Sequence, residues 1–122
     1  MEKDGSVNVL GGALQPCSVS PMTGFFRDGA CNTCWEDHGL HTVCVVLTAE
    51  FLAWSRYIGN DLTTPRPDLA FPGLKPGERW CLCAGRFMEA HDEGCAPQVV
   101  LECTHRRTLE VVPFEVLSAY AI

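Results

Sequence analysis

Residues 24–48, GFFRDGACNTCWEDHGLHTVCVVLT, bring three cysteines and two histidines into one short stretch of the chain. The stretch passes from a glycine-containing loop into an apolar, β-branched run, so it delivers polar side chains at the start of a predicted strand. Binding and catalytic residues are often carried by such loops. We therefore expect this loop to carry the functional site and the rest of the chain to form its scaffold.

The hydrophobic pattern outside this loop predicts short strands and helices that follow one another along the chain. Strands are predicted at 41–48, 79–83, 99–104 and 109–112, and helices at 49–58, 84–93 and 114–121. Thr48 is the expected N-cap of the first helix, and Gly59 is expected to end it. The last two strands would form a hairpin through a turn at 105–107.

Two long segments that contain proline and glycine, 11–40 and 60–78, separate these elements. We expect both to be ordered loops, because their apolar side chains can pin them to the core. The resulting fold class is α+β, a compact two-layer sandwich with a small mixed or antiparallel sheet and about three helices. Residues 1–122 are expected to form a single domain, with 1–6 as a loose N-terminal tail.

The composition restricts the partners and the compartment. The formal net charge is −6 at pH 7, without the basic patch that phosphate backbones or anionic membranes attract, so we expect neither nucleic acid nor membrane as a partner. No signal-peptide pattern begins the chain, and a cytoplasmic location is expected. In that reducing compartment the eight cysteines would be free thiols, metal ligands or small buried side chains. The pattern leaves the oligomeric state open.

A series of different short motifs covers almost the whole chain. In order, these are Asn8-Val9-Leu10-Gly11, Pro16-Cys17-Ser18, Thr23-Gly24-Phe25, Arg27-Asp28-Gly29, Cys31-Asn32-Thr33, His41-Thr42-Val43-Cys44, Gly59-Asn60-Asp61-Leu62, Phe71-Pro72-Gly73-Leu74, Trp80-Cys81-Leu82-Cys83-Ala84 and Thr104-His105. Together they resemble the DUF2237 family of small, uncharacterised bacterial proteins, over a region from Asn8 to Leu117. The resemblance implies a single domain and brings no catalytic assignment.

The chain departs from the pattern of that family at a few positions. Ala30 stands where the family often has a cysteine, and Cys34 stands where a glycine is usual. Trp35 replaces a usual proline and Phe87 a usual tryptophan. A site that depends on Cys34 would therefore be peculiar to this chain.

Two cysteine pairs have spacings that suit metal binding. Cys31 and Cys34 form a CxxC motif, and Cys81 and Cys83 form a CxC motif whose side chains would share one strand face, about 6.6 Å apart. One version of the site is therefore a structural zinc ion held by four thiolates. A second version is a catalytic metal with an open coordination position. Its predicted ligands are Cys31, Cys81, Cys83 and His41, with His105 as the alternative histidine and zinc or iron as the expected ion.

Thiol chemistry is the third version of the site. Cys31 or Cys83 would be the nucleophile and His41 or His105 the general base, and Cys83 gains from its position just before a predicted helix. In contrast, Cys44 and Cys103 lie in apolar runs and are expected to be buried. The residues expected to contact a polar small molecule are Arg27, Asp28, Asn32, Asn60, Asp61, Trp80 and Arg86.

Three hypotheses for the function follow. The first is a protein that binds a metal ion or small ligand in a polar, cysteine-lined pocket between the 24–48 loop and the 80–84 segment. The alternative is a thiol- or metal-dependent enzyme that uses Cys31, Cys81 or Cys83 with His41 or His105. The second alternative is an interaction protein in which the cysteines only pack. No reaction or substrate follows from the sequence.

Overall fold

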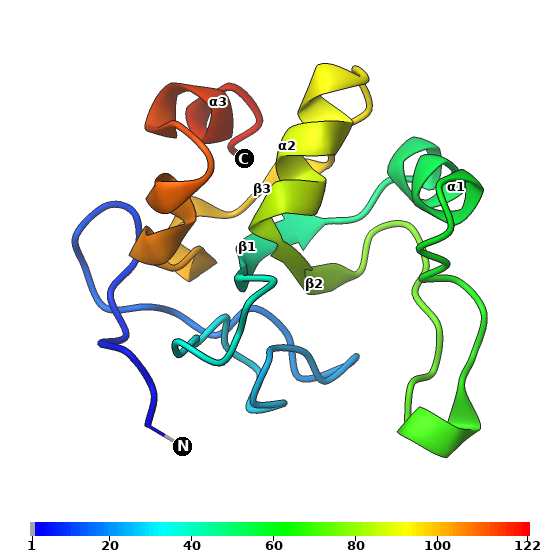
Figure 1. The fold of residues 1–122 in the computed structure, drawn as a ribbon, viewed down its shortest axis with the longest axis horizontal. Helices are drawn as coiled ribbons and strands as arrows, with labels where there is room; N and C mark the ends of the chain where they lie inside the picture. The colour runs from blue at the N-terminus through cyan, green and yellow to red at the C-terminus, as the bar shows by residue number, and fades with distance from the viewer. Residues whose placement is uncertain (1) are drawn as a thin grey trace.

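A small sheet lies between a layer of helices and a layer of ordered loops in the computed structural model, which describes residues 2–122 (Figure 1). The strands are β1 (His41–Val46), β2 (Arg79–Cys83) and β3 (Gln98–Val99), and the helices are α1 (Ala49–Tyr57), α2 (Ala84–Asp92) and α3 (Phe114–Ala119). The strand order is β2-β1-β3 and both pairings are antiparallel. The fold is therefore α+β, as the sequence predicted.

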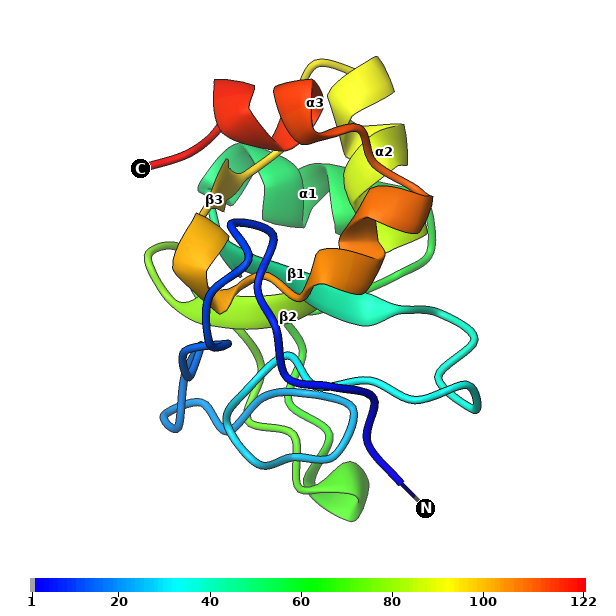
Figure 2. The same cartoon turned by 90° about the vertical axis from the view of Figure 1, so that its left-hand side faces the viewer.

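The central strand β1 has a different environment on each face, because successive side chains of a strand point to opposite sides. Val43 and Val45 belong to the apolar core that the helices complete, which also contains Phe51, Phe87 and Leu117. Cys44 belongs instead to a cluster of buried cysteines on the loop side of the sheet. Figure 2 shows the helices above the sheet and the N-terminal loops below it.

The first helix begins and ends as its sequence predicts. Thr48 is the N-cap, and its hydroxyl accepts a hydrogen bond of 3.1 Å from the backbone N–H of Phe51. Beyond the helix, Gly59 adopts a left-handed φ of 94°, which glycine reaches without steric cost. The predictions for β1, β2, α2 and α3 are also confirmed, with ends that differ by no more than three residues from those expected.

The predicted hairpin near the C-terminus is wrong. Only Val99 and its neighbour Gln98 form a strand there, and 3₁₀ turns follow at Leu101–Cys103 and Arg106–Glu110. The reason is Thr104, whose hydroxyl accepts a hydrogen bond from the backbone N–H of Cys44 (3.1 Å) and donates one to the carbonyl of Val100 (2.9 Å). This side chain takes the place of a ladder bond and ends the strand.

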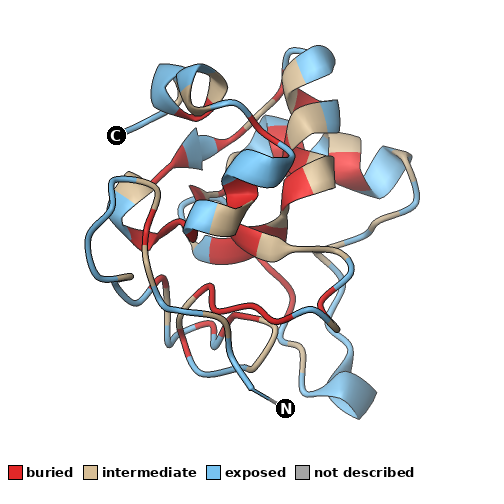
Figure 3. Cartoon of the chain, turned by 60° about the vertical axis from the view of Figure 1, so that its left-hand side comes forward, coloured by how far each residue is buried: buried red, intermediate tan, exposed pale blue. Residues whose placement is uncertain are grey.

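Two disulfides fasten the long 11–40 loop to the sheet. Cys17 is bonded to Cys44 of β1 and Cys31 to Cys81 of β2, with Cα–Cα distances of 5.7 and 5.3 Å. The expectation that these cysteines are unpaired is therefore wrong, because the loop crosses the sheet and brings together residues that are distant in the sequence. Figure 3 shows buried segments in this loop layer as well as in the helix layer.

Hydrogen bonds also order the two long loops. The hydroxyl of Thr23, which is fully buried, accepts a bond of 2.8 Å from the backbone N–H of Cys81. In the 60–78 segment, the backbone N–H of Leu74 donates to the carbonyl of Leu62 across the base of the loop (2.8 Å).

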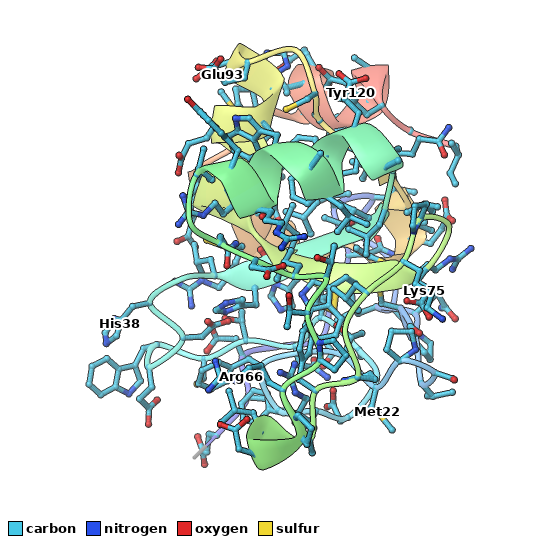
Figure 4. All side chains as sticks on the ribbon, turned by 90° about the vertical axis from the view of Figure 1, so that its right-hand side faces the viewer. Met22, His38, Arg66, Lys75, Glu93 and Tyr120 are labelled. Carbon is cyan, nitrogen blue, oxygen red and sulfur yellow. A yellow bond between two sulfur atoms is a disulfide. The ribbon has the colours of Figure 1, made fainter. Side chains whose placement is uncertain are left out.

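Figure 4 shows Met22, His38 and Arg66 on the loop side of the sheet and Glu93 and Tyr120 on the helix side. None of the described helices is long and apolar enough to cross a membrane.

Reduction of the two disulfides is expected to destabilise the chain. They close segments with sequence separations of 27 and 50 residues, and loops of that length correspond to about 3–4 kcal/mol of unfolding free energy for each bond. Urea unfolding with and without a phosphine reductant measures this change, and a thiol count verifies that reduction is complete. A C31A/C81A variant should lose only the unfolding free energy that the Cys31–Cys81 bond contributes. An unchanged urea midpoint after full reduction would contradict the expectation.

Candidate functional site

A cleft of about 310 Å³ opens where the 24–27 turn meets the start of β1 and the end of β2. Its walls include Phe25, Arg27, His41, Asn60, Trp80 and Cys83. These residues come from the loop at 24–48, from the 80–84 segment and from the 60–62 region. The cleft therefore combines a thiol, an imidazole, a guanidinium and an aromatic wall within one small volume.

Cys83 is the thiol of this cleft. Among residues 2–122 the unpaired cysteines are Cys34, Cys83, Cys95 and Cys103, and of these only Cys83 is not fully buried. It is the last residue of β2 and the N-cap of α2, and no side chain caps that helix. The positive end of the α2 dipole therefore lies at Cys83.

The imidazole of the cleft, His41, is held by a buried carboxylate. His41 Nδ1 lies 2.7 Å from Oδ1 of Asp37, whose side chain is fully buried while that of His41 is 44% exposed. The second oxygen of Asp37 accepts bonds from the Thr33 hydroxyl (2.9 Å) and from the His41 backbone N–H (3.0 Å). Because a carboxylate only accepts, Nδ1 is the donor to Asp37, and in the neutral ring this leaves Nε2 as an acceptor.

His41 and Cys83 lie opposite each other in the ladder between β1 and β2. The register is irregular between His41 and Val43, and both His41 and Cys83 line the cleft. The cleft thus holds a thiol and an imidazole, and the buried carboxylate of Asp37 orients that imidazole. Phe25 stacks on the His41 ring, with centroids 6.4 Å apart and an interplanar angle of 25°.

Asp37 is the residue of the candidate site that the sequence analysis missed. It is acidic, close to Cys34 and His38, and nothing in the local pattern separates it from a solvated loop carboxylate. The only available signal is that it precedes His41 by four residues. Its burial at 2% exposure comes from the folded loop, which the sequence pattern does not reveal.

Arg27 provides a positive charge at the mouth of the cleft. Its guanidinium lies 5.0 Å from the ring centroid of Trp80, and Nη1 donates to the carbonyl of Gly24 (3.2 Å). Arg27 has a left-handed φ of 52°, uncommon for a residue other than glycine. No carboxylate in the described part of the chain lies within ion-pair distance of it. The cleft is therefore suited to an anionic group.

Of the polar residues predicted to contact a ligand, Arg27, Asn60 and Trp80 line the cleft. Asp28 instead braces the loop by accepting bonds from Lys3 (2.7 Å) and Asn32 (3.0 Å). Although burial raises the pKa of Asp28, the hydrogen bond from Lys3, followed by those from Ala30 and Asn32, keeps it below its ordinary value.

Asp61 and Arg86 also have structural partners. Asp61 accepts hydrogen bonds from the hydroxyls and backbone N–H groups of Thr63 and Thr64, and these bonds, above all that from the Thr64 hydroxyl, hold its pKa well below the ordinary value. Arg86 pairs with Glu89 on the surface of α2 at 3.3 Å. Both are therefore braces of their own segments.

The four predicted metal ligands do not come together as one group. Cys31 and Cys81 form a disulfide, and of the four only Cys31 does not line the cleft. Within residues 2–122, the one group of at least three metal-ligating atoms at mutual distances within 4.8 Å is the set of Sγ atoms of Cys17, Cys31 and Cys81. Cys17 was not among the predicted ligands, because its distance in sequence from the others hides this proximity.

His105 has a structural environment that differs from that of His41. It is 1% exposed, its Nε2 donates to the carbonyl of Gly5 (2.8 Å), and its Nδ1 accepts from the backbone N–H of Arg107 (3.1 Å). Both ring nitrogens are therefore occupied in the neutral form, and burial lowers the pKa of His105. This histidine anchors the N-terminal arm and does not line the cleft.

The fold and the cleft define a small cysteine-rich α+β domain in which a thiol and a histidine held by a buried carboxylate share one cavity. A family model described as "Uncharacterized protein conserved in bacteria (DUF2237)" matches residues 7–121, and the chain belongs to this family. This confirms the resemblance noted from the sequence motifs. A comparison with curated proteins found no match.

The buried His105 is expected to make stability depend on pH. Because its pKa in the folded chain lies below the ordinary 6.5, the unfolded chain binds a proton that the folded chain does not at pH values between the two. The free energy of unfolding should therefore fall as the pH drops from 6.5 towards the folded pKa. Well above pH 6.5, His105 should contribute no slope.

Urea unfolding at a series of pH values on both sides of this window measures the slope. An H105Q variant should have a flatter profile than the parent chain, even if the variant is less stable at every pH. Substitution of the exposed His38 by Gln is the matched control and should leave the profile unchanged. Identical slopes in the H105Q variant and the parent would contradict the expectation.

Proposed function

We propose that the cleft binds a small molecule with an anionic group and that Cys83 attacks an electrophilic carbon of that molecule. The observation that carries this proposal is the arrangement of Cys83 opposite His41, whose ring is oriented by the buried Asp37. A nucleophile, a base and a group that orients the base are the parts that covalent catalysis requires. Of the hypotheses drawn from the sequence, the thiol-dependent enzyme is the one this geometry supports best.

Each side chain has a role in the proposed reaction. His41 Nε2 takes the proton of the Cys83 thiol, and Asp37 stabilises the resulting imidazolium. The sulfur forms a bond to a carbonyl carbon, and the leaving group departs with the proton that His41 returns. Water then hydrolyses the thioester, which restores the thiol and releases an acid.

The substrate class follows from the walls of the cleft. Arg27 is suited to a carboxylate or phosphate of the substrate, and Trp80 provides an apolar face beside it. The volume of about 310 Å³ is at the lower end of the range for small-molecule sites. We therefore propose a small ester, thioester or amide that carries a separate anionic group.

Selective alkylation tests whether Cys83 is an activated nucleophile. With iodoacetamide under native, non-reducing conditions, we expect one rapidly modified thiol per chain, identified as Cys83 by peptide mass analysis. The C83S variant should lose the rapid phase, and the C34S variant, which alters a buried unpaired thiol, should keep it. H41Q should slow the reaction by about tenfold or more, because it removes the base. A rate no higher than that of free glutathione would contradict the proposal.

A second substitution tests the position of His41 without removing any functional group. A Cβ atom at Gly39 would lie 2.8 Å from Cε1 of His41, so G39A must displace the ring. We expect slower alkylation of Cys83 with an intact fold, monitored by circular dichroism. G5A is the control, because a Cβ there meets no atom within 4 Å. Equal alkylation rates in G39A and the parent would show that the ring position is irrelevant.

A further inference from the structure

The two disulfides lie side by side beneath the sheet. Cys17 is bonded to Cys44, yet its Sγ atom also lies within 4.8 Å of the Sγ atoms of both Cys31 and Cys81. All four residues are at most 4% exposed and belong to one buried cluster. Four sulfur atoms from two separate bonds are therefore gathered in one small volume.

We propose that the reduced chain binds one zinc ion through the thiolates of Cys17, Cys31, Cys44 and Cys81. The two disulfides are then the oxidised, metal-free state of the same site. This set differs from the one expected from the sequence, because Cys17 and Cys44 take the places of Cys83 and His41. It shares the buried Cys81 with the wall of the cleft but uses neither Cys83 nor His41.

The geometry of the cluster suits a tetrahedral site. Zinc–sulfur bonds of about 2.3 Å place the sulfur atoms of a tetrahedron about 3.8 Å apart. The three Sγ atoms that lie within 4.8 Å of one another are therefore close to ligand positions. When the bonds of 2.04 and 2.07 Å are reduced, each pair has to open by less than 2 Å, which side-chain rotation can supply.

The backbone holds these four residues in place by means other than the disulfides. Cys44 and Cys81 face each other on the paired strands β1 and β2. On the loop side, the backbone N–H of Cys17 donates to the carbonyl of Gly29 (2.7 Å), two residues before Cys31. Two ligands thus come from the sheet and two from an ordered loop, so the positions should survive reduction.

The surroundings also define which thiols are ligands. Cys103 belongs to the same cluster, but its Sγ donates to the carbonyl of Pro16 (3.2 Å) and is therefore engaged outside the proposed ligand set. The backbone N–H groups of Cys44 and Cys81 donate hydrogen bonds to the hydroxyls of Thr104 and Thr23. These bonds hold the backbone of the two strand ligands in position.

Conversion between the disulfide state and the zinc-bound state conserves electrons and protons. Two molecules of a dithiol reductant each supply two electrons and two protons, so that two disulfides become four thiols and the reductant becomes two disulfides. Binding of the divalent ion then releases the four thiol protons. In the reverse direction, two molecules of an oxidised disulfide such as oxidised glutathione re-form the protein disulfides and release the ion.

Cobalt titration of the full-length chain tests the proposal. The chain is reduced without oxygen, the reductant is removed, and cobalt(II) is added as a spectroscopic substitute for zinc. We expect the ligand-field and charge-transfer bands of a tetrahedral thiolate site, saturating at one ion per reduced chain, and no such bands with the oxidised chain. Absence of these bands in the reduced chain would overturn the proposal, whether or not that chain is folded.

Variants distinguish this ligand set from the one expected from the sequence. C17S and C44S should weaken cobalt binding by at least about tenfold, whereas C83S and H41Q should leave it unchanged. The buried C34S is the matched control for loss of an unpaired thiol. If C83S or H41Q abolishes the bands while C17S and C44S do not, the proposed ligands are wrong.

A second measurement avoids any variant that fails to fold. The zinc-loaded parent chain is oxidised stepwise with oxidised glutathione, and released zinc is followed with a chromophoric chelator. We expect one zinc ion to appear as four thiols disappear, with peptide mapping of the Cys17–Cys44 and Cys31–Cys81 bonds in the product. Retention of zinc after both bonds have formed would show that the metal lies elsewhere.

Discussion

The register between β1 and β2 is the constraint on which the rest of this structure depends. It sets Cys44 opposite Cys81 and, beyond an irregularity between His41 and Val43, His41 opposite Cys83, so the cysteine cluster and the thiol-containing cleft both depend on this strand pair. A slip of one residue would turn every side chain to the other face of the sheet. The cysteines would then enter the apolar core of Val43 and the helices, and neither site would exist.

The loop layer is held by two disulfides and by polar contacts, in contrast to the apolar packing of the helix layer. Asp37 accepts three bonds from Thr33 and His41, and Thr23 and Thr104 each bond a backbone N–H of the sheet. Buried polar groups of this kind are costly unless every partner is present. These contacts therefore fix the conformation of the loop and with it the position of His41.

The sequence was sufficient where one periodicity dominates a segment. The apolar run around Val45 and the cap at Thr48 predicted β1 and α1 because local patterns determine these elements. The same approach failed at Thr104, where a side-chain hydroxyl replaces a ladder bond, and at Cys17, whose partner Cys44 is distant in the sequence. Contacts of both kinds depend on the tertiary fold and leave no periodic signal in the chain.

The cysteines show how environment divides one residue type among several roles. Cys81 and Cys83 are two positions apart on β2, yet Cys81 is buried in a disulfide and Cys83 is unpaired at a helix N-terminus. At Cys95, burial, together with Glu50 and Glu93, raises the pKa of the thiol and keeps it protonated. Reactivity requires both access and stabilisation of the thiolate. Of the unpaired cysteines among residues 2–122, Cys83 is the one that combines access with a position at a helix N-terminus and a histidine in the same cleft, and for this reason the nucleophile is proposed there.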